Sequence, residues 1–213
     1  TAPSSKTVNG TVTAAGTGVI NLGTTAVNVT GSSTIGGTST GQITVGAATL
    51  SDGVTLTLGA GAATPISTGA ISGTASGAVS NLTINTTGAV TVGGAVGTDM
   101  GTVTVTQSGG TTFNGTVDAA TIALTDTADG QTVSFTQNTN ATTGMTVANA
   151  GSDNYNVSFT GGANTIAGAT TFNNGGTLTL GDGGDTINFT GGVVATAPSS
   201  KTVNGTVTAA GTG

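Results

Sequence analysis

Apolar and polar residues alternate along short stretches throughout the chain. The apolar positions are mostly Val, Ile and Leu, and the intervening positions are Thr, Ser or Asn. An alternation with a period of two places all apolar side chains on one face of a β-strand. The pattern therefore predicts many short strands, each with one buried face. These strands are expected at residues 27–30, 43–45, 54–58, 82–85, 90–92, 103–106, 122–125, 133–136, 155–160, 178–180 and 187–190.

Helix signals are nearly absent. No apolar period of 3.6 residues is sustained, and glycine, a poor helix former, interrupts every long window. Turn-forming clusters separate the alternating stretches, as at 51–53, 128–130, 173–176 and 182–185. The chain is therefore predicted to be all-β with almost no helix.

One segment occurs twice. Residues 1–18 read TAPSSKTVNGTVTAAGTG, and residues 196–213 repeat all eighteen letters. Residues 1–195 are therefore interpreted as one unit of a tandem repeat, and residues 196–213 as the first coil of the next unit. A period this long exceeds the usual 20–50 residues of solenoid repeats, so smaller coils are expected inside each unit.

Strands recurring every 8–13 residues or so fit two architectures. One is a parallel β-solenoid, in which each coil of the chain stacks on the previous one. The other is a string of antiparallel β-sandwich domains. Short Thr, Ser and Asn side chains that can form ladders, an aromatic content of only 3 % and the lack of a linker before residue 196 favour the solenoid.

The solenoid interpretation makes specific predictions. Coils of roughly 20–25 residues give about 8–10 coils per unit, and at roughly 4.8 Å per coil an axial repeat of about 40–50 Å. The two copies of the duplicated segment are expected to have the same conformation, with their four valines (Val8, Val12, Val203 and Val207) buried alike and Lys6 and Lys201 pointing outward. Eight core residues are predicted from the alternation: Val133, Phe135, Val157, Phe159, Leu178, Leu180, Ile187 and Phe189. The larger side chains of the 145–190 region predict a slightly wider core there.

Composition narrows the function classes. Charged residues make up 5 % of the chain and the net charge is −6, so no basic patch is available for nucleic acid. Abundant Val, Ile and Thr with only three prolines argue against disorder. No cysteine is present, which excludes a disulfide scaffold, and no apolar run approaches the length of a membrane helix. Any targeting signal is expected to lie outside this segment.

The chain lacks His, Cys, Glu and Arg, so it has no residues for a Ser-His-Asp triad or a Cys-His pair. Carboxylate pairs for glycoside hydrolysis are conceivable at Asp126 with Asp129 and at Asp182 with Asp185, but both pairs lie in glycine-containing turns, where Asp normally caps the backbone. The chain is therefore predicted not to be an enzyme and to need no cofactor. Residues 181–187, GDGGDTI, are similar to one imperfect copy of the calcium-binding β-roll motif, which makes Asp182 and Asp185 candidate calcium ligands.

Threonine ladders raise a further hypothesis, a flat ice-binding face. Such a face needs Thr-x-Thr at one position of every coil. The irregular spacing of Thr along the sequence argues against it.

Residues 163–192, together with GTTFNGTVDAAT at 110–121, resemble very large bacterial beta-strand-repeat surface proteins. These are similar to filamentous-haemagglutinin-like adhesins and autotransporter passenger repeats. The resemblance implies a right-handed parallel β-helix, secretion to the bacterial cell surface or exterior, and no active site. The predicted function is a structural repeat segment of an extracellular fibre or adhesin stalk, whose partners are further copies or adjacent repeats joined end to end. The alternative is an adhesin module that binds carbohydrate or a host surface.

Overall fold

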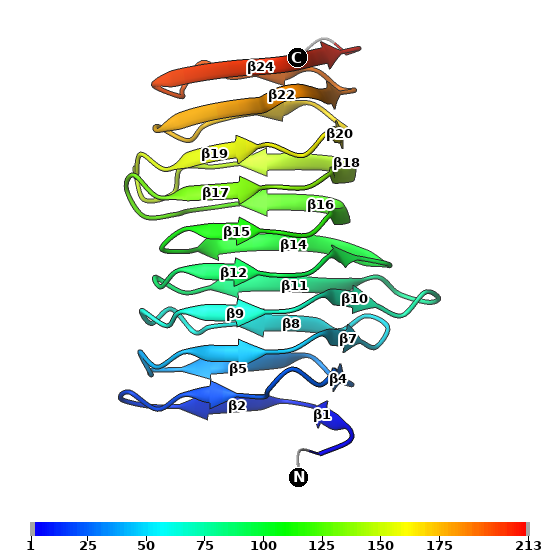
Figure 1. Cartoon of the computed structure of the whole chain (residues 1–213), viewed down its shortest axis with the longest axis vertical. Helices are drawn as coiled ribbons and strands as arrows, with labels where there is room; N and C mark the ends of the chain where they lie inside the picture. The colour runs from blue at the N-terminus through cyan, green and yellow to red at the C-terminus, as the bar shows by residue number, and fades with distance from the viewer. Residues whose placement is uncertain (1–2, 212–213) are drawn as a thin grey trace.

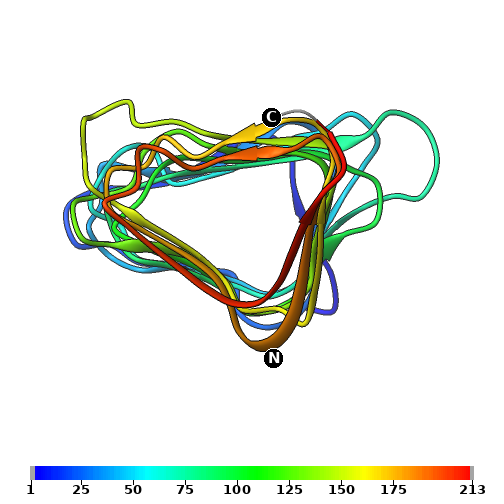
Figure 2. The ribbon, with the colours of Figure 1, turned by 90° about the horizontal axis from the view of Figure 1, so that it is seen from above.

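The computed structural model describes residues 3–211 as a β-solenoid of parallel strands (Figure 1). The chain winds about one axis, with residue 3 at the lower end and the last strand at the upper end. Seen along the axis, the coils superpose as a triangle (Figure 2). No helix among residues 3–211 is long and apolar enough to cross a membrane.

Each coil contributes one strand to each side of the triangle, and we name the sides faces A, B and C in chain order. Face A holds β1 (Lys6–Val8), β4 (Val27–Val29), β7 (Ala48–Leu50), β10 (Ile71–Gly73), β13 (Val96–Gly97) and β20 (Ala163–Ile166). Face B holds β2 (Thr11–Ala14), β5 (Ser33–Gly37), β8 (Thr55–Leu58), β11 (Ser80–Asn85), β14 (Met100–Gln107), β21 (Thr170–Thr171) and β23 (Val193–Val194). Face C holds β3 (Ile20–Asn21), β6 (Ile43–Val45), β9 (Ile66–Thr68), β12 (Val90–Val92), β15 (Thr111–Phe113), β17 (Thr132–Phe135) and β19 (Asn156–Phe159).

Four strands bend around a corner of the triangle. Two of them run from face A to face B, namely β16 (Val117–Leu124) and β18 (Thr139–Val147). The other two run from face C to face A, namely β22 (Thr177–Phe189) and β24 (Ser200–Ala209).

The strand register confirms the predicted coil length. Val27 pairs with Ala48 in the next coil, and Ile71 pairs with Val96. Both separations along the chain lie within the predicted range, and the second is the longer one. Loops at the corners take up the difference, as in the protruding loop between β10 and β11 (Figures 1 and 2). Variable loops thus leave the strands aligned, and the antiparallel sandwich alternative does not apply.

The interior confirms the predicted core. Each of the eight residues named above is at most 6 % exposed. The aromatic rings form a continuous column. Phe113 stacks on Phe135 and Phe135 on Phe159, with ring centroids 5.1 and 4.9 Å apart, and the next two contacts, to Phe172 and Phe189, are edge-to-face. Parallel register produces the stack of the first three rings, because it places Phe113, Phe135 and Phe159 over one another on face C. Phe172 and Phe189 come from faces B and A and meet this stack edge-on.

The two copies of the duplicated segment lie on different faces of the solenoid. Lys6 lies on face A, in register with Val27, whereas Lys201 lies on face C, in register with Leu178. On face A, ten strand segments are stacked from that of Lys6 to that of Val207. On face C, nine are stacked from that of Ile20 to that of Lys201. The path from Lys6 to Lys201 therefore covers eight coils and two thirds of a ninth.

Two predictions about these copies are wrong. Lys6 and Lys201 do not point outward, because each is in register with a core position, Val27 or Leu178. The valines are not buried alike, because Val8 is 7 % exposed and Val203 is 58 % exposed. Both valines belong to end coils of the described structure, but Val8 lies in a cavity lined by Pro3 and Leu22, whereas the upper side of Val203 is open. The first and last two residues of the duplicated sequences, 1–2 and 212–213, lie outside the described residues.

Candidate functional site

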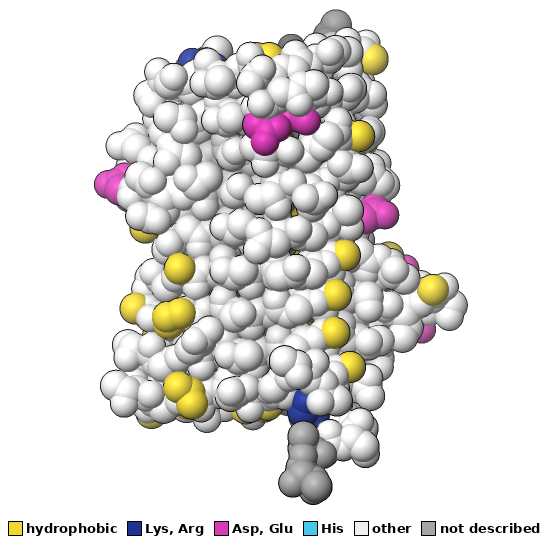
Figure 3. All heavy atoms as spheres, in the orientation of Figure 1, with side chains coloured by type: hydrophobic (Ala, Val, Ile, Leu, Met, Phe, Trp, Pro, Cys, Tyr) yellow, Lys and Arg dark blue, Asp and Glu magenta, His cyan; other side chains and the backbone are white. Residues whose placement is uncertain are grey.

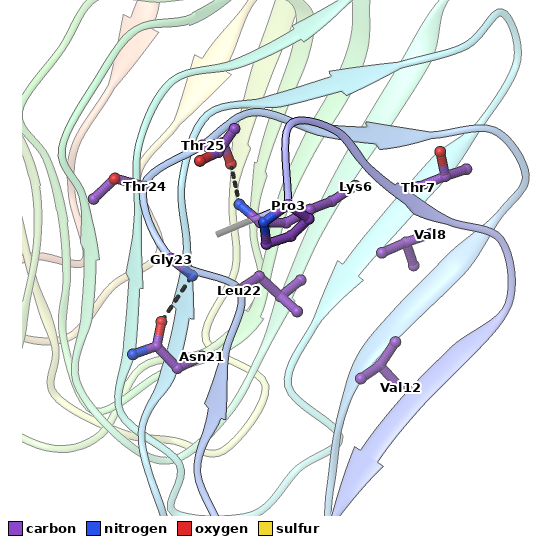
Figure 4. A pocket seen from close by; sticks show the side chains of 10 residues that line it. All are labelled: Pro3, Lys6, Thr7, Val8, Val12, Asn21, Leu22, Gly23, Thr24 and Thr25. Atoms are coloured by element: carbon purple, nitrogen blue, oxygen red, sulfur yellow. Dashed lines mark hydrogen bonds between the residues drawn. The ribbon is translucent and has the colours of Figure 1, made fainter. Parts of the chain in front are cut away.

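The lower end of the solenoid opens as a cavity of about 730 Å³, which we call the lower mouth (Figure 4). Its wall is made by residues of the first coil: Pro3, Lys6, Thr7, Val8, Val12, Asn21, Leu22, Gly23, Thr24 and Thr25. Lys6 spans part of it, and its Nζ donates a hydrogen bond to the Thr25 carbonyl oxygen at 2.9 Å. The lower mouth is therefore the uncovered end of the apolar core, with one cation at its side.

The upper end carries the second copy of the same segment. Strand β24 pairs with β22 below it, and no described strand pairs with its upper edge. Its side chains are exposed or half-buried, including Val203 and Lys201. An unpaired edge strand presents free backbone N–H and C=O groups that readily pair with another strand.

The two candidate calcium ligands lie in the corner within β22. Asp185 is 6 % exposed, and its Oδ2 accepts a hydrogen bond from the Asp182 backbone N at 2.6 Å. Three glycines with positive φ make the bend possible: Gly181, Gly183 and Gly184. The Asp185 carboxylate thus has a structural partner in the turn. Among residues 3–211, no group of three or more acidic or histidine side chains is placed to hold a metal ion. Calcium binding stays a prediction.

The other carboxylate pair, Asp126 and Asp129, lies in one corner loop, between β16 and β17. Asp126 Oδ1 accepts a hydrogen bond from the Thr127 backbone N at 2.9 Å, and Asp129 Oδ1 accepts one from the Asn154 backbone N at 2.5 Å. Nothing in the local sequence indicated that Asp153, from the next coil, joins them. Desolvation, followed by repulsion from Asp126 and Asp129, raises the pKa of Asp153 above its ordinary value. Asp126 and Asp129 act as turn-capping groups, as their glycine-containing context indicated.

Face B carries an outward-pointing column of threonines. Register aligns Thr in six of seven successive coils, with Ala123 as the exception, and the members are Thr11, Thr34, Thr57, Thr83, Thr104 and Thr146. Sequence spacing failed to reveal this column, because corner loops of unequal length hide the alignment. The adjacent outward column is mixed, with Thr55, Asn81, Thr102 and Thr121. The Thr-x-Thr pairs that the ice-binding hypothesis needs in every coil are therefore not regular.

The surface around these features is mostly uncharged and polar, and acidic and basic side chains are few and scattered (Figure 3). No family model, curated protein or solved structure matches the chain. The two solenoid ends and the threonine column of face B are the features on which a function can be built.

Proposed function

We propose that the chain is a structural repeat segment of a secreted bacterial extracellular fibre or adhesin stalk, which continues coaxially by the stacking of coils. The observation that carries this proposal is the duplicated segment itself. Within its second copy, residues 200–209 are already stacked on the end of the first unit as a further layer of the same solenoid (Figure 1). The strand pairing of one unit therefore passes into the next without a linker.

The physical properties of the coil stack suit a stalk. Interior strands have a parallel neighbour above and below, except that β21 is joined to the coil below it by one bridge, Val147 to Phe172, and the apolar core runs through all coils. In such a quasi-one-dimensional structure each coil is stabilised by its neighbours, so adding units lengthens the rod and covers the ends that are otherwise open. The stability of a rod with few charged side chains should depend little on salt concentration, because salt acts by screening charges.

The proposed role is not enzymatic, and its partners are copies of the same unit joined end to end. Three carboxylates, those of Asp126, Asp129 and Asp185, accept hydrogen bonds from backbone groups of turns. This use of carboxylates supports a structural assignment. The surface localisation rests on the resemblance to bacterial beta-strand-repeat surface proteins.

A second candidate function is an adhesin module that binds carbohydrate or a host surface. The threonine column of face B favours it, because the column presents a straight row of hydroxyl and methyl groups at the coil spacing of about 4.8 Å. A regular row of this kind suits a flat or repetitive ligand. The stalk function alone does not explain why a row of threonines is exposed.

The test of the stalk is to localise the chain on intact cells of its source bacterium. Antibodies against the folded chain are expected to decorate thin filaments along their whole length in electron micrographs. Signal restricted to the cytoplasm would contradict secretion, and signal restricted to filament tips would favour the adhesin module. Replacing Thr57, Thr83 and Thr104 with serine separates the two functions, because serine keeps the hydroxyl and removes the methyl. Filaments should persist in this variant, whereas a carbohydrate or host-surface site on face B should weaken.

A further inference from the structure

Each copy of the duplicated segment shows a different neighbouring coil: the first copy shows the coil above the segment, and the second copy shows the coil below it. In the first copy, the coil above it is visible. Lys6 pairs with Val27, Val8 with Val29 and Val12 with Ile35. In the second copy, the coil below it is visible. Lys201 pairs with Leu178, Val203 with Leu180 and Val207 with Ile187. Since the sequences are identical, the two views together describe one complete junction between units.

We propose that the lower mouth is the docking surface for a preceding copy of the same unit, and that successive units are rotated by one third of a turn. This inference rests on the proposed stalk function and specifies how its units join. Residues 177–189 of the preceding unit lie under residues 5–14, in the register seen between residues 177–189 and 200–209. The core is thereby continuous across the junction. Lys6 lies between Leu178 below and Val27 above, Val8 between Leu180 and Val29, and Val12 between Ile187 and Ile35.

The glycine at the corner of the segment, Gly10 in the first copy and Gly205 in the second, supports a preceding unit as the occupant of the lower mouth. A Cβ at Gly205 would lie 2.6 Å from the Asp185 carbonyl oxygen of the coil below, so the backbone approaches too closely for a side chain. The equivalent Gly10 has nothing within 4 Å of its Cβ position in the described structure. The space below Gly10 therefore fits the corner that Asp185 forms in a preceding unit. The same corner occurs in both copies, between the two short strands at Gly10 and within β24 at Gly205.

The one-third turn follows from the length of the unit. One unit covers eight coils and two thirds of a ninth, so a second unit starts on face C where the first started on face A. At about 4.8 Å per coil the axial advance is about 42 Å per unit. Three units make twenty-six whole coils, after which every residue returns to its original face, about 125 Å along the axis. A feature that projects from one corner, such as the loop between β10 and β11, then follows a three-fold spiral along the fibre.

Lysine placement at the junction has a second consequence. Lys6 and Lys201 are the only basic residues of the chain, and they occupy the same repeat position. Each unit thus places one cation in an inward-facing column that is mostly apolar, with Thr139 and Asn164 as polar members on face A and Thr111 on face C. If separate chains met end to end with residues 196–209 directly under residues 5–14, the two copies would place one lysine against the other. Continuation of the chain avoids this repulsion, because the coils next to the segment supply Leu178 and Val27 instead.

The register between residues 177–189 and 200–209 is tested first in the chain itself. The chain has no cysteine, so only the introduced thiols can react. Thr179 and Thr202 are outward-facing partners, and so are Thr186 and Thr206. The variants Thr179→Cys/Thr202→Cys and Thr186→Cys/Thr206→Cys are expected to cross-link nearly completely with a short thiol-specific reagent. The matched control, Thr186→Cys/Thr202→Cys, combines the same positions out of register and should cross-link at least ten-fold less. Equal cross-linking of all three pairs would overturn the register.

The rotation is tested in a chain that carries two further copies of residues 1–195 before residue 1. The single substitution Ser76→Cys in each unit, in the protruding loop, provides a site for a gold label. Electron microscopy is expected to show labels spaced about 42 Å along a stiff rod, the advance set by the strand spacing, and turned by one third of a turn from unit to unit. Labels in one straight row on a stiff rod would overturn the rotation and leave the stalk function standing. Units with variable spacing, joined like beads, would overturn both the junction and the coaxial stalk.

Discussion

The middle of the solenoid and its two end coils are built from the same kinds of residues, yet they differ in exposure. Phe159, in the interior, has Phe135 below and Leu180 above in register, contacts Phe172 edge-to-face and is fully buried. Val203 alternates with polar residues in the same manner, but it is 58 % exposed because no described coil lies above it. Burial in this fold is therefore not a property of a residue's own strand alone. It also depends on what covers the strand from above and below.

The same comparison applies to equivalent residues of the two identical copies, which differ in exposure. Val8 and Val203 occupy the same position of the duplicated segment, and their exposures are 7 % and 58 %. Each has one neighbouring strand in register, Val29 above Val8 and Leu180 below Val203. Val8 lines the lower mouth together with Pro3 and Leu22, whereas the upper side of Val203 is open. In a longer array we expect both positions to be equally buried, because each then has two neighbouring coils.

The largest effect is expected for Phe159→Ala. Removing this fully buried ring leaves a cavity between the stacked ring of Phe135 and the edge-to-face ring of Phe172, so the free energy of unfolding should fall by about 3–5 kcal/mol. Val203→Ala at the open end is the control and should cost about 0.5 kcal/mol or less. Denaturant unfolding of both variants measures the difference. A loss below about 1 kcal/mol for Phe159→Ala would contradict its place in the core.

A second pair of variants compares neighbouring glycines within one interior turn. A Cβ at Gly161 would lie 2.2 Å from the Gln137 carbonyl carbon, whereas a Cβ at Gly162 meets only the Asn138 side chain at 4.0 Å. Because the coil below cannot yield easily, Gly161→Ala should lower the free energy of unfolding by about 1–3 kcal/mol. Gly162→Ala should change it by less than about 0.5 kcal/mol. Similar midpoints in denaturant for the two variants would show that the coils are not stacked this closely.

The corner next to the end coil offers a smaller effect. Asp185→Ala removes the acceptor for the Asp182 backbone N, and we expect a loss of about 1–2 kcal/mol from this lost hydrogen bond. Asp182→Ala, which changes an exposed side chain, is the control. Melting with and without a calcium chelator decides between the two roles of these residues. If the chelator lowers the melting temperature of the parent chain and not that of Asp185→Ala, the carboxylate binds calcium as well as capping the turn.

The smallest effect at neutral pH concerns Tyr155, the single tyrosine of the chain. Burial, followed by the nearby charge of Asp126, raises the pKa of the Tyr155 hydroxyl, which donates a hydrogen bond to the Ala148 carbonyl oxygen. A raised pKa in the folded state means that Tyr155 contributes stability fully below the pKa of about 10 of an unfolded tyrosine, and that this contribution declines at higher pH. Tyrosinate absorbance should therefore appear only as the chain unfolds in alkali. Reversible ionisation near the pKa of a free tyrosine, with the fold intact, would place the hydroxyl in solvent.

Much of the architecture could be predicted from the sequence because local alternation and global stacking agree. Residues such as Val133 and Phe189 alternate with short polar side chains, and that alternation was enough to assign both to the core. The turn role of Asp185 was also visible, since a carboxylate flanked by glycines is typical of a bend. The threonine column of face B was not visible, because the alignment of Thr57 with Thr83 depends on the length of the loops between them.

The sequence by itself determined that the chain forms short half-buried strands arranged in coils, and that the unit begins again at residue 196. Both are local properties, readable from a period of two and from an identity between two segments. Only the tertiary structure decided on which face each segment lies. Lys6 and Lys201 have identical local sequences, and they lie on faces A and C because one unit fills eight coils and two thirds of a ninth. That fraction depends on the summed lengths of all the corner loops between them, which no single window of the sequence contains.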